Sequence, residues 1–142
     1  MERSKPWLVC ALILLGVQVW LLYSPAGAPS TEGLAAMLRQ VLTPLPGPSA
    51  PGEPGFDKVA HATSFAAVTA ALLLARLPSG WVVGFSVVHA ITSEIVQALL
   101  IPGRDGDPVD ALFDLGGILF AWAVITWWKN RTGKESNAAG TR

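Results

Sequence analysis

The chain has 142 residues, of which 51% are hydrophobic and 14% are charged, and ten Lys and Arg balance ten Asp and Glu. Soluble proteins carry roughly 25% charged residues, so this composition indicates a membrane protein. The zero net charge argues against a nucleic-acid partner, and the single cysteine, Cys10, excludes an internal disulfide. The length allows one domain, which we place at residues 1–134, followed by a polar tail at residues 135–142.

The first apolar segment, residues 7–23, follows the basic residues Arg3 and Lys5 and contains one clearly polar residue, Gln18. Its length is marginal for a transmembrane helix. A basic start, an apolar run and then Ala26-Gly27-Ala28 also fit a secretory signal peptide with its cleavage site. Because the apolar run is longer than the usual signal core of about 7–15 residues, we favour an uncleaved membrane anchor.

Residues 24–56 are rich in Pro and Gly, which prevent a continuous helix. Within this loop, residues 31–42 place apolar side chains at helical spacing opposite Glu32, Arg39 and Gln40. The pattern predicts a short amphipathic helix on the membrane surface between the first two spans. A linker without fixed structure is the alternative.

Three further apolar segments predict transmembrane helices at residues 57–77, 81–101 and 110–128. Pro78-Ser79-Gly80 and Pro102-Gly103 mark the turns between them. Basic residues flank the predicted spans mainly on one side, which the positive-inside rule makes cytoplasmic: Arg3, Lys5, Arg76, Lys129, Arg131 and Lys134. The sequence therefore predicts an all-α integral membrane four-helix bundle with both termini in the cytoplasm.

In this topology, polar residues of three spans collect in the outer half of the bilayer: Asp57, Lys58, His61, Glu94, Gln97, Arg104, Asp110 and Asp114. Residues four apart share a helix face, as Asp57 and His61 do, and also Asp110 and Asp114. A carboxylate near the middle of a span, such as that of Glu94, costs about 2.5–3.5 kcal/mol. Residues kept at such a cost mark a candidate site.

Three segments carry a resemblance to a known family: DKVAHATSF at 57–65, EIVQ at 94–97 and RDGDPVDALFDLGG at 104–117. In this order they resemble the VanZ-like family of bacterial membrane proteins, named for a teicoplanin-resistance protein, over about half the chain. Asp114 stands where that family usually has Asn. The residues that the resemblance assigns to the functional cluster are Asp57, Lys58, His61, Phe65, Glu94, Gln97, Arg104, Asp110 and Gly117.

The resemblance also implies a multi-pass protein of the bacterial plasma membrane with a role in the cell envelope, linked to glycopeptide resistance. Three functions from different classes fit the residues. The first, which requires least of the sequence, is binding of a lipid head group or lipid-linked cell-wall precursor through Lys58 and Arg104. The second is a membrane-embedded hydrolase or transferase acting on a lipid-linked phosphate, with His61 as base and Glu94 or Asp110 as its partner. The third is a small transporter or proton relay that uses Glu94 and His61.

The spacing predicts neither a metal ion nor a cofactor. Asp57, His61, Glu94 and Asp110 offer nitrogen and oxygen ligands, but no closely spaced ligand pair such as H-x-x-x-H occurs among them. The sequence favours a binding protein over an enzyme without deciding between them.

Structural pairing accounts for the same residues, because intramembrane polar groups pair whether or not they react. On this interpretation His61 hydrogen-bonds to Glu94 or Asp110, and His89 to Ser93. The outer cations would then form ion pairs that join Lys58 or Arg104 to Asp57, Asp105 or Asp107.

Overall fold

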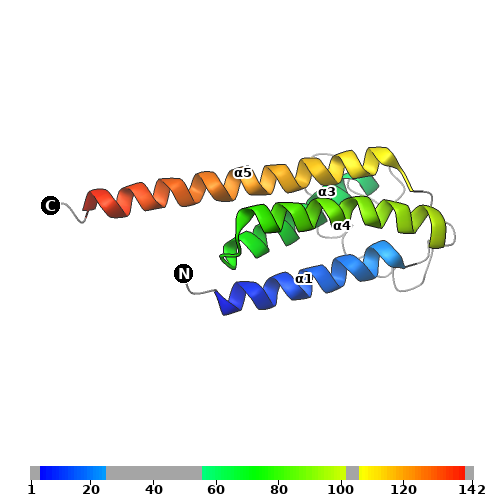
Figure 1. The fold of residues 1–142 in the computed structure, drawn as a ribbon, viewed down its shortest axis with the longest axis horizontal. Coiled ribbons are helices and arrows are strands. Elements are labelled where there is room, and N and C mark those ends of the chain that lie inside the picture. Colours follow the sequence, from blue (N-terminus) through cyan, green and yellow to red (C-terminus); the bar gives the residue numbers. More distant parts are fainter. Residues whose placement is uncertain (1–3, 25–55, 102–105, 140–142) are drawn as a thin grey trace.

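The computed structural model describes residues 4–24, 56–101 and 106–139, with side chains at 4–24, 58–101 and 106–132. This part of the chain is all-helical. Its helices lie side by side in Figure 1, and they are α1 (Lys5–Tyr23), α3 (Phe56–Leu74), α4 (Ser79–Leu100) and α5 (Pro108–Ala139). The predicted surface helix at residues 31–42, with most of the loop that contains it, lies outside the described residues.

Three of these helices are long and apolar enough to cross a membrane: Lys5–Tyr23, Ser79–Leu100 and Pro108–Thr132. Large apolar side chains on them point outward, among them Trp81 at 80% exposure and Leu99 at 75%. Such a surface would be costly in water and is ordinary against lipid tails. The chain is therefore a membrane protein by the length and composition of its helices.

Helix α3 contacts each of the other three helices, most extensively α5. Its small and apolar residues supply much of the core, with Phe65 1% exposed and Val68, Ala71 and Leu73 also buried. It ends at Leu74, three residues before the predicted boundary, because Arg76 adopts a left-handed conformation with φ of 63°. Pro78 disfavours helix in the residue before it, which fixes the break between α3 and α4.

Helix α5 continues to Ala139, beyond the predicted span at residues 110–128 and into the predicted polar tail at residues 135–142. The residues after Trp128 include Lys129, Arg131 and Lys134, which are polar but good helix formers. The polar residues that follow Trp128 therefore do not end the helix.

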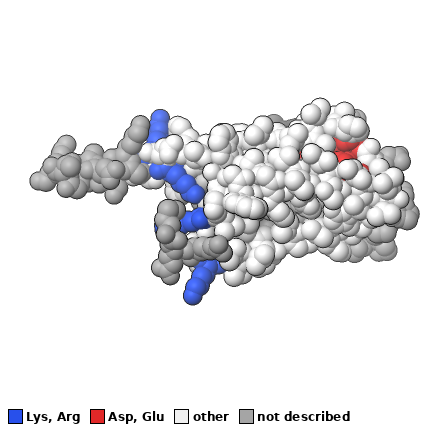
Figure 2. Space-filling model, viewed as in Figure 1, with Lys and Arg blue, Asp and Glu red and all other residues white. Residues whose placement is uncertain are grey.

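The two ends of the molecule carry opposite charges (Figure 2). Lys and Arg side chains gather at the basic end, where α1 begins and α3 gives way to α4; the residues there are Lys5, Arg76, Lys129 and Arg131. Backbone contacts close this end: Lys129 Nζ donates to the Leu73 carbonyl at 2.6 Å, and the Ser4 N–H donates to the Ala75 carbonyl at 3.3 Å. The acidic end, formed by Glu94, Asp107, Asp110 and Asp114, lies opposite.

Candidate functional site

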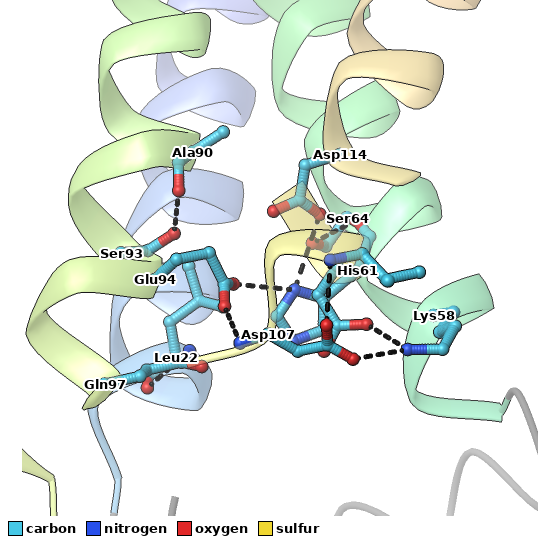
Figure 3. A network of polar contacts seen from close by, with 12 residues as sticks. Leu22, Lys58, His61, Ser64, Ala90, Ser93, Glu94, Gln97, Asp107 and Asp114 are labelled. Atoms are coloured by element: carbon cyan, nitrogen blue, oxygen red, sulfur yellow. Dashed lines mark hydrogen bonds and ion pairs between the residues drawn. The ribbon is translucent and has the colours of Figure 1, made fainter. Parts of the chain in front are cut away.

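The acidic end brings three ionisable side chains from three helices into one buried cluster (Figure 3). His61 comes from α3, Glu94 from α4 and Asp114 from α5, and one nitrogen or oxygen atom of each lies within 4.8 Å of the other two. His61 Nδ1 is 3.4 Å from Asp114 Oδ1 and 3.8 Å from Glu94 Oε1. The three side chains are 11%, 9% and 0% exposed in the order His61, Glu94, Asp114.

The atoms that face one another in this triad make no hydrogen bonds to any residue that the structure describes. They are His61 Nδ1, Glu94 Oε1 and both carboxylate oxygens of Asp114. The 3.4 Å contact between His61 and Asp114 exceeds ordinary hydrogen-bond length. A buried polar group left without a partner costs about 1–3 kcal/mol, and more when it is charged. The triad is thus the least satisfied polar site in the described structure.

A second group of charges lies beside the triad at the start of α5. Lys58 Nζ donates to Asp107 Oδ2 at 2.9 Å and to Asp110 Oδ1 at 2.8 Å. The prediction that Lys58 pairs with a neighbouring aspartate is confirmed for Asp107. These bonds occupy two of the three ammonium hydrogens, and the Lys58 side chain is 25% exposed.

Asp107 connects the two groups. Its carboxylate accepts the Val109 N–H at 2.8 Å, as an N-cap does before a proline at the first helical position. Its own N–H donates to Glu94 Oε2 at 2.9 Å, which fixes the orientation of the Glu94 carboxylate. The hydrogen bond from Lys58 lowers the pKa of Asp107 below its ordinary value, and the bond from Val109 lowers it further.

Two hydrogen bonds expected from the sequence, one of His61 and one of His89, are not made. His61 lies nearest to Asp114, because Lys58 takes Asp110 and the Glu94 contact is longer than a hydrogen bond. The predicted bond between His89 and Ser93 is wrong, since the Ser93 hydroxyl donates to the Ala90 carbonyl of its own helix at 2.8 Å.

The other residues of the predicted cluster have packing roles or lie outside the described side chains. Gln97 Nε2 donates to the Leu22 carbonyl at 3.1 Å, which joins α4 to the end of α1. Phe65 is in the core, with its ring centroid 5.4 Å from that of His89. The side chain of Asp57 and the whole of Arg104 are outside the described residues.

Gly117 sets the distance between α3 and α5 at the triad. A Cβ atom there would lie 2.9 Å from the Ala62 carbonyl carbon and would collide with the Ala62 carbonyl oxygen. Ala62 follows His61 in the chain, and Gly117 is close to Asp114 on α5. The absent side chain therefore lets α5 approach closely enough for Asp114 to reach His61.

An apolar groove of about 620 Å³ runs along the outside of the same two helices. Its walls are residues next to the triad in sequence and residues one turn deeper: Ala62, Thr63 and Ala66 on α3, and Leu112, Phe113, Gly116, Gly117 and Phe120 on α5. Phe120 is 69% exposed and Leu112 is 66% exposed. The groove is open to the surroundings, and its lining includes Ala62, which follows His61, and Phe113, which precedes Asp114.

Sequence reasoning missed two contributors to this end of the molecule. Asp107 was weighed only as an ion-pair partner, although an Asp directly before a Pro that opens a helix is a recognisable N-cap. Gln18, the single polar residue of the first span, donates to the Ser64 hydroxyl at 3.1 Å, and Ser64 in turn donates to the His61 carbonyl at 2.9 Å. A lone polar residue in an apolar span was a usable signal for such a contact.

No protein family, curated protein or solved structure matches this chain. The residues, distances and charges of the site carry its interpretation.

Proposed function

We propose that this protein is a four-span helix bundle of the bacterial plasma membrane and that it binds a lipid with an anionic head group at the outer surface. Both termini and the basic end lie in the cytoplasm, and the acidic end faces outward. The support for this orientation is the position of Lys5, Arg76, Lys129 and Arg131 at one end. The resemblance of three segments to VanZ-like proteins supports a role in the cell envelope and a link to glycopeptide resistance.

One observation carries the binding proposal, namely that an apolar groove and a polar cluster adjoin on α3 and α5. A membrane lipid has the same two parts, a hydrocarbon chain and a polar head. The exposed residues of the groove face the bilayer in this orientation, so a lipid chain can enter from the side. Asp107 and Asp110 hold the Lys58 nitrogen in place, and its third ammonium hydrogen can bond to the head group.

The test is to fill the groove without disturbing the core. Gly116 lines the groove, and a Cβ atom on it meets nothing within 4 Å, so Gly116→Leu should fold and occupy the space of a lipid chain. Gly84 on α4 is equally open and lies outside this groove, which makes Gly84→Leu the matched control. Lipids retained by each protein after purification from the membrane in detergent are measured by native mass spectrometry.

We expect the wild type and Gly84→Leu to retain the same anionic lipid, and Gly116→Leu to retain at least about tenfold less of it, a loss equal to about 1.4 kcal/mol of binding. Lys58→Met should shift the retained lipids away from anionic species. Equal retention by Gly116→Leu and Gly84→Leu would rule out the groove as the binding surface.

A further inference from the structure

The buried triad has the chemistry of a cation site. It offers one imidazole nitrogen and two carboxylate oxygens, a donor set that suits Zn²⁺ and related divalent ions. Two ligands of a tetrahedral ion with bonds of about 2.1 Å lie about 3.4 Å apart. The distances from His61 Nδ1 to Asp114 Oδ1 and to Glu94 Oε1, 3.4 Å and 3.8 Å, are close to this spacing.

The hydrogen bonding of the triad independently indicates a ligand. Asp114 is 0% exposed, and neither of its oxygens has a hydrogen-bond partner among the described residues. The same holds for the atoms of His61 and Glu94 that face it. Side chains that only stabilise one another would be expected to close these gaps to hydrogen-bond length.

The charge at the triad is also not fully compensated by the described side chains. Lys58 is 2.9 Å and 2.8 Å from two other carboxylates, those of Asp107 and Asp110, and its hydrogen bonds go to them. The carboxylates of Glu94 and Asp114 therefore share a buried site with the His61 imidazole, which is neutral or singly charged. A divalent ion would neutralise both at once.

The surroundings of Glu94 are those of an oriented metal ligand. Its Oε2 accepts the Asp107 N–H at 2.9 Å, which leaves Oε1 directed toward His61. Metal-binding carboxylates are commonly held by such a second hydrogen bond. Because the triad comes from three separate helices, the sequence showed no ligand spacing, and the prediction of no metal followed from that.

We propose that His61 Nδ1, Glu94 Oε1 and Asp114 Oδ1 bind one divalent transition-metal ion, of which Zn²⁺ is the representative. Three protein ligands leave a tetrahedral ion one further position for water or for another ligand. The proposal stands apart from lipid binding, since either property can exist without the other.

The test uses the full chain in detergent micelles after removal of metals with a chelator. Zn²⁺ is titrated by calorimetry at pH 7 into the wild type, Asp114→Asn and Glu94→Gln. We expect one ion per chain with micromolar or tighter affinity in the wild type. Loss of a direct ligand should weaken binding by at least about 100-fold, since loss of a supporting partner already costs about 10–100-fold.

Asp110→Asn is the matched control. It removes the same charge from a position one helical turn before Asp114, and the carboxylate that it removes is one to which Lys58 donates. Its Zn²⁺ affinity should stay within about threefold of the wild type. Equal weakening by Asp110→Asn and Asp114→Asn would show general attraction to acidic residues and overturn the site. A wild type that binds no stoichiometric ion would overturn it as well.

A second measurement tests metal binding by the wild type itself. Co²⁺ bound by three protein ligands in tetrahedral geometry absorbs visible light far more strongly than hydrated Co²⁺ does. Adding Co²⁺ to the metal-free wild type should produce this absorption, and one equivalent of Zn²⁺ should abolish it. A spectrum equal to that of Co²⁺ in buffer would contradict the proposal. Gly116→Leu should keep the absorption, which separates a failure of lipid binding from a failure of metal binding.

Discussion

Asp107 shows how one residue can hold together elements that are distant in sequence. Its carboxylate bonds to Lys58 of α3 and caps the first turn of α5, while its N–H bonds to Glu94 of α4. The first of these contacts depends on the ionised carboxylate, and the last does not. Its charge can therefore be tested separately from its main-chain role.

The Lys58 contact predicts a specific pH dependence. Because the pKa of Asp107 is lower in the folded protein than its ordinary 3.8, ionisation of Asp107 adds stability above that value, and the contribution disappears as the pH falls through the lowered pKa. Asp107→Asn retains an N-capping side chain and removes only the charge. It should lower the unfolding temperature in detergent by about 1–4 °C at pH 7, because half-exposed ion pairs are weak. The difference from the wild type should shrink as the pH falls below 3.8.

A double variant supplies the control. In a Lys58→Met background the Asp107 carboxylate has lost its cation, so adding Asp107→Asn should change the unfolding temperature by less than it does in the wild type. The same change in both backgrounds would mean that the Lys58 contact contributes nothing to stability.

At the scale of the helices, the α3–α5 contact depends on the missing side chain of Gly117. Gly117→Ala would drive a methyl group into the Ala62 backbone, which cannot move aside as a flexible side chain can. We expect a loss of about 1–3 kcal/mol in unfolding free energy, measured by denaturant titration in mixed micelles. Gly116→Ala meets nothing within 4 Å and should be neutral, or stabilising by up to about 1 kcal/mol, because Ala is the better helix former. Similar behaviour of the two variants would show that the helices separate readily at this point.

The α3–α5 contact also separates the parts of the site that could be predicted from the sequence from those that could not. Apolar length indicated the helices, and polar residues at their ends indicated that α3, α4 and α5 would contribute side chains to one place. Periodicity placed Asp110 and Asp114 on one face of a helix. It could not say which of them reaches His61, since that depends on the depth at which Gly117 meets Ala62. The partner of Ser93 was missed because its hydroxyl donates to the Ala90 carbonyl of its own helix, a bond that the spacing of side chains does not predict.

Across the whole molecule, the separation of charges predicts the direction of insertion. We expect Pro108→Cys at the acidic end to react with a membrane-impermeant maleimide in intact bacterial cells, and Ser79→Cys at the basic end to react only after permeabilisation. Both positions are exposed, and both variants are made in a Cys10→Ser background so that the natural thiol does not react. The reversed pattern would place the acidic end in the cytoplasm and would remove the support for a lipid of the outer surface.

The two ends are also closed by different kinds of bond. At the basic end, Lys129 and the Ser4 N–H donate to carbonyl groups, which do not titrate. At the acidic end, Lys58 pairs with Asp107, and this contact weakens when the Asp107 carboxylate is protonated. In the proposed orientation, the titrating end meets the medium outside the cell, whereas the other end meets a cytoplasm of nearly constant pH. Acid outside the cell would therefore weaken the Lys58–Asp107 contact at the outer end and leave the carbonyl contacts at the inner end unchanged.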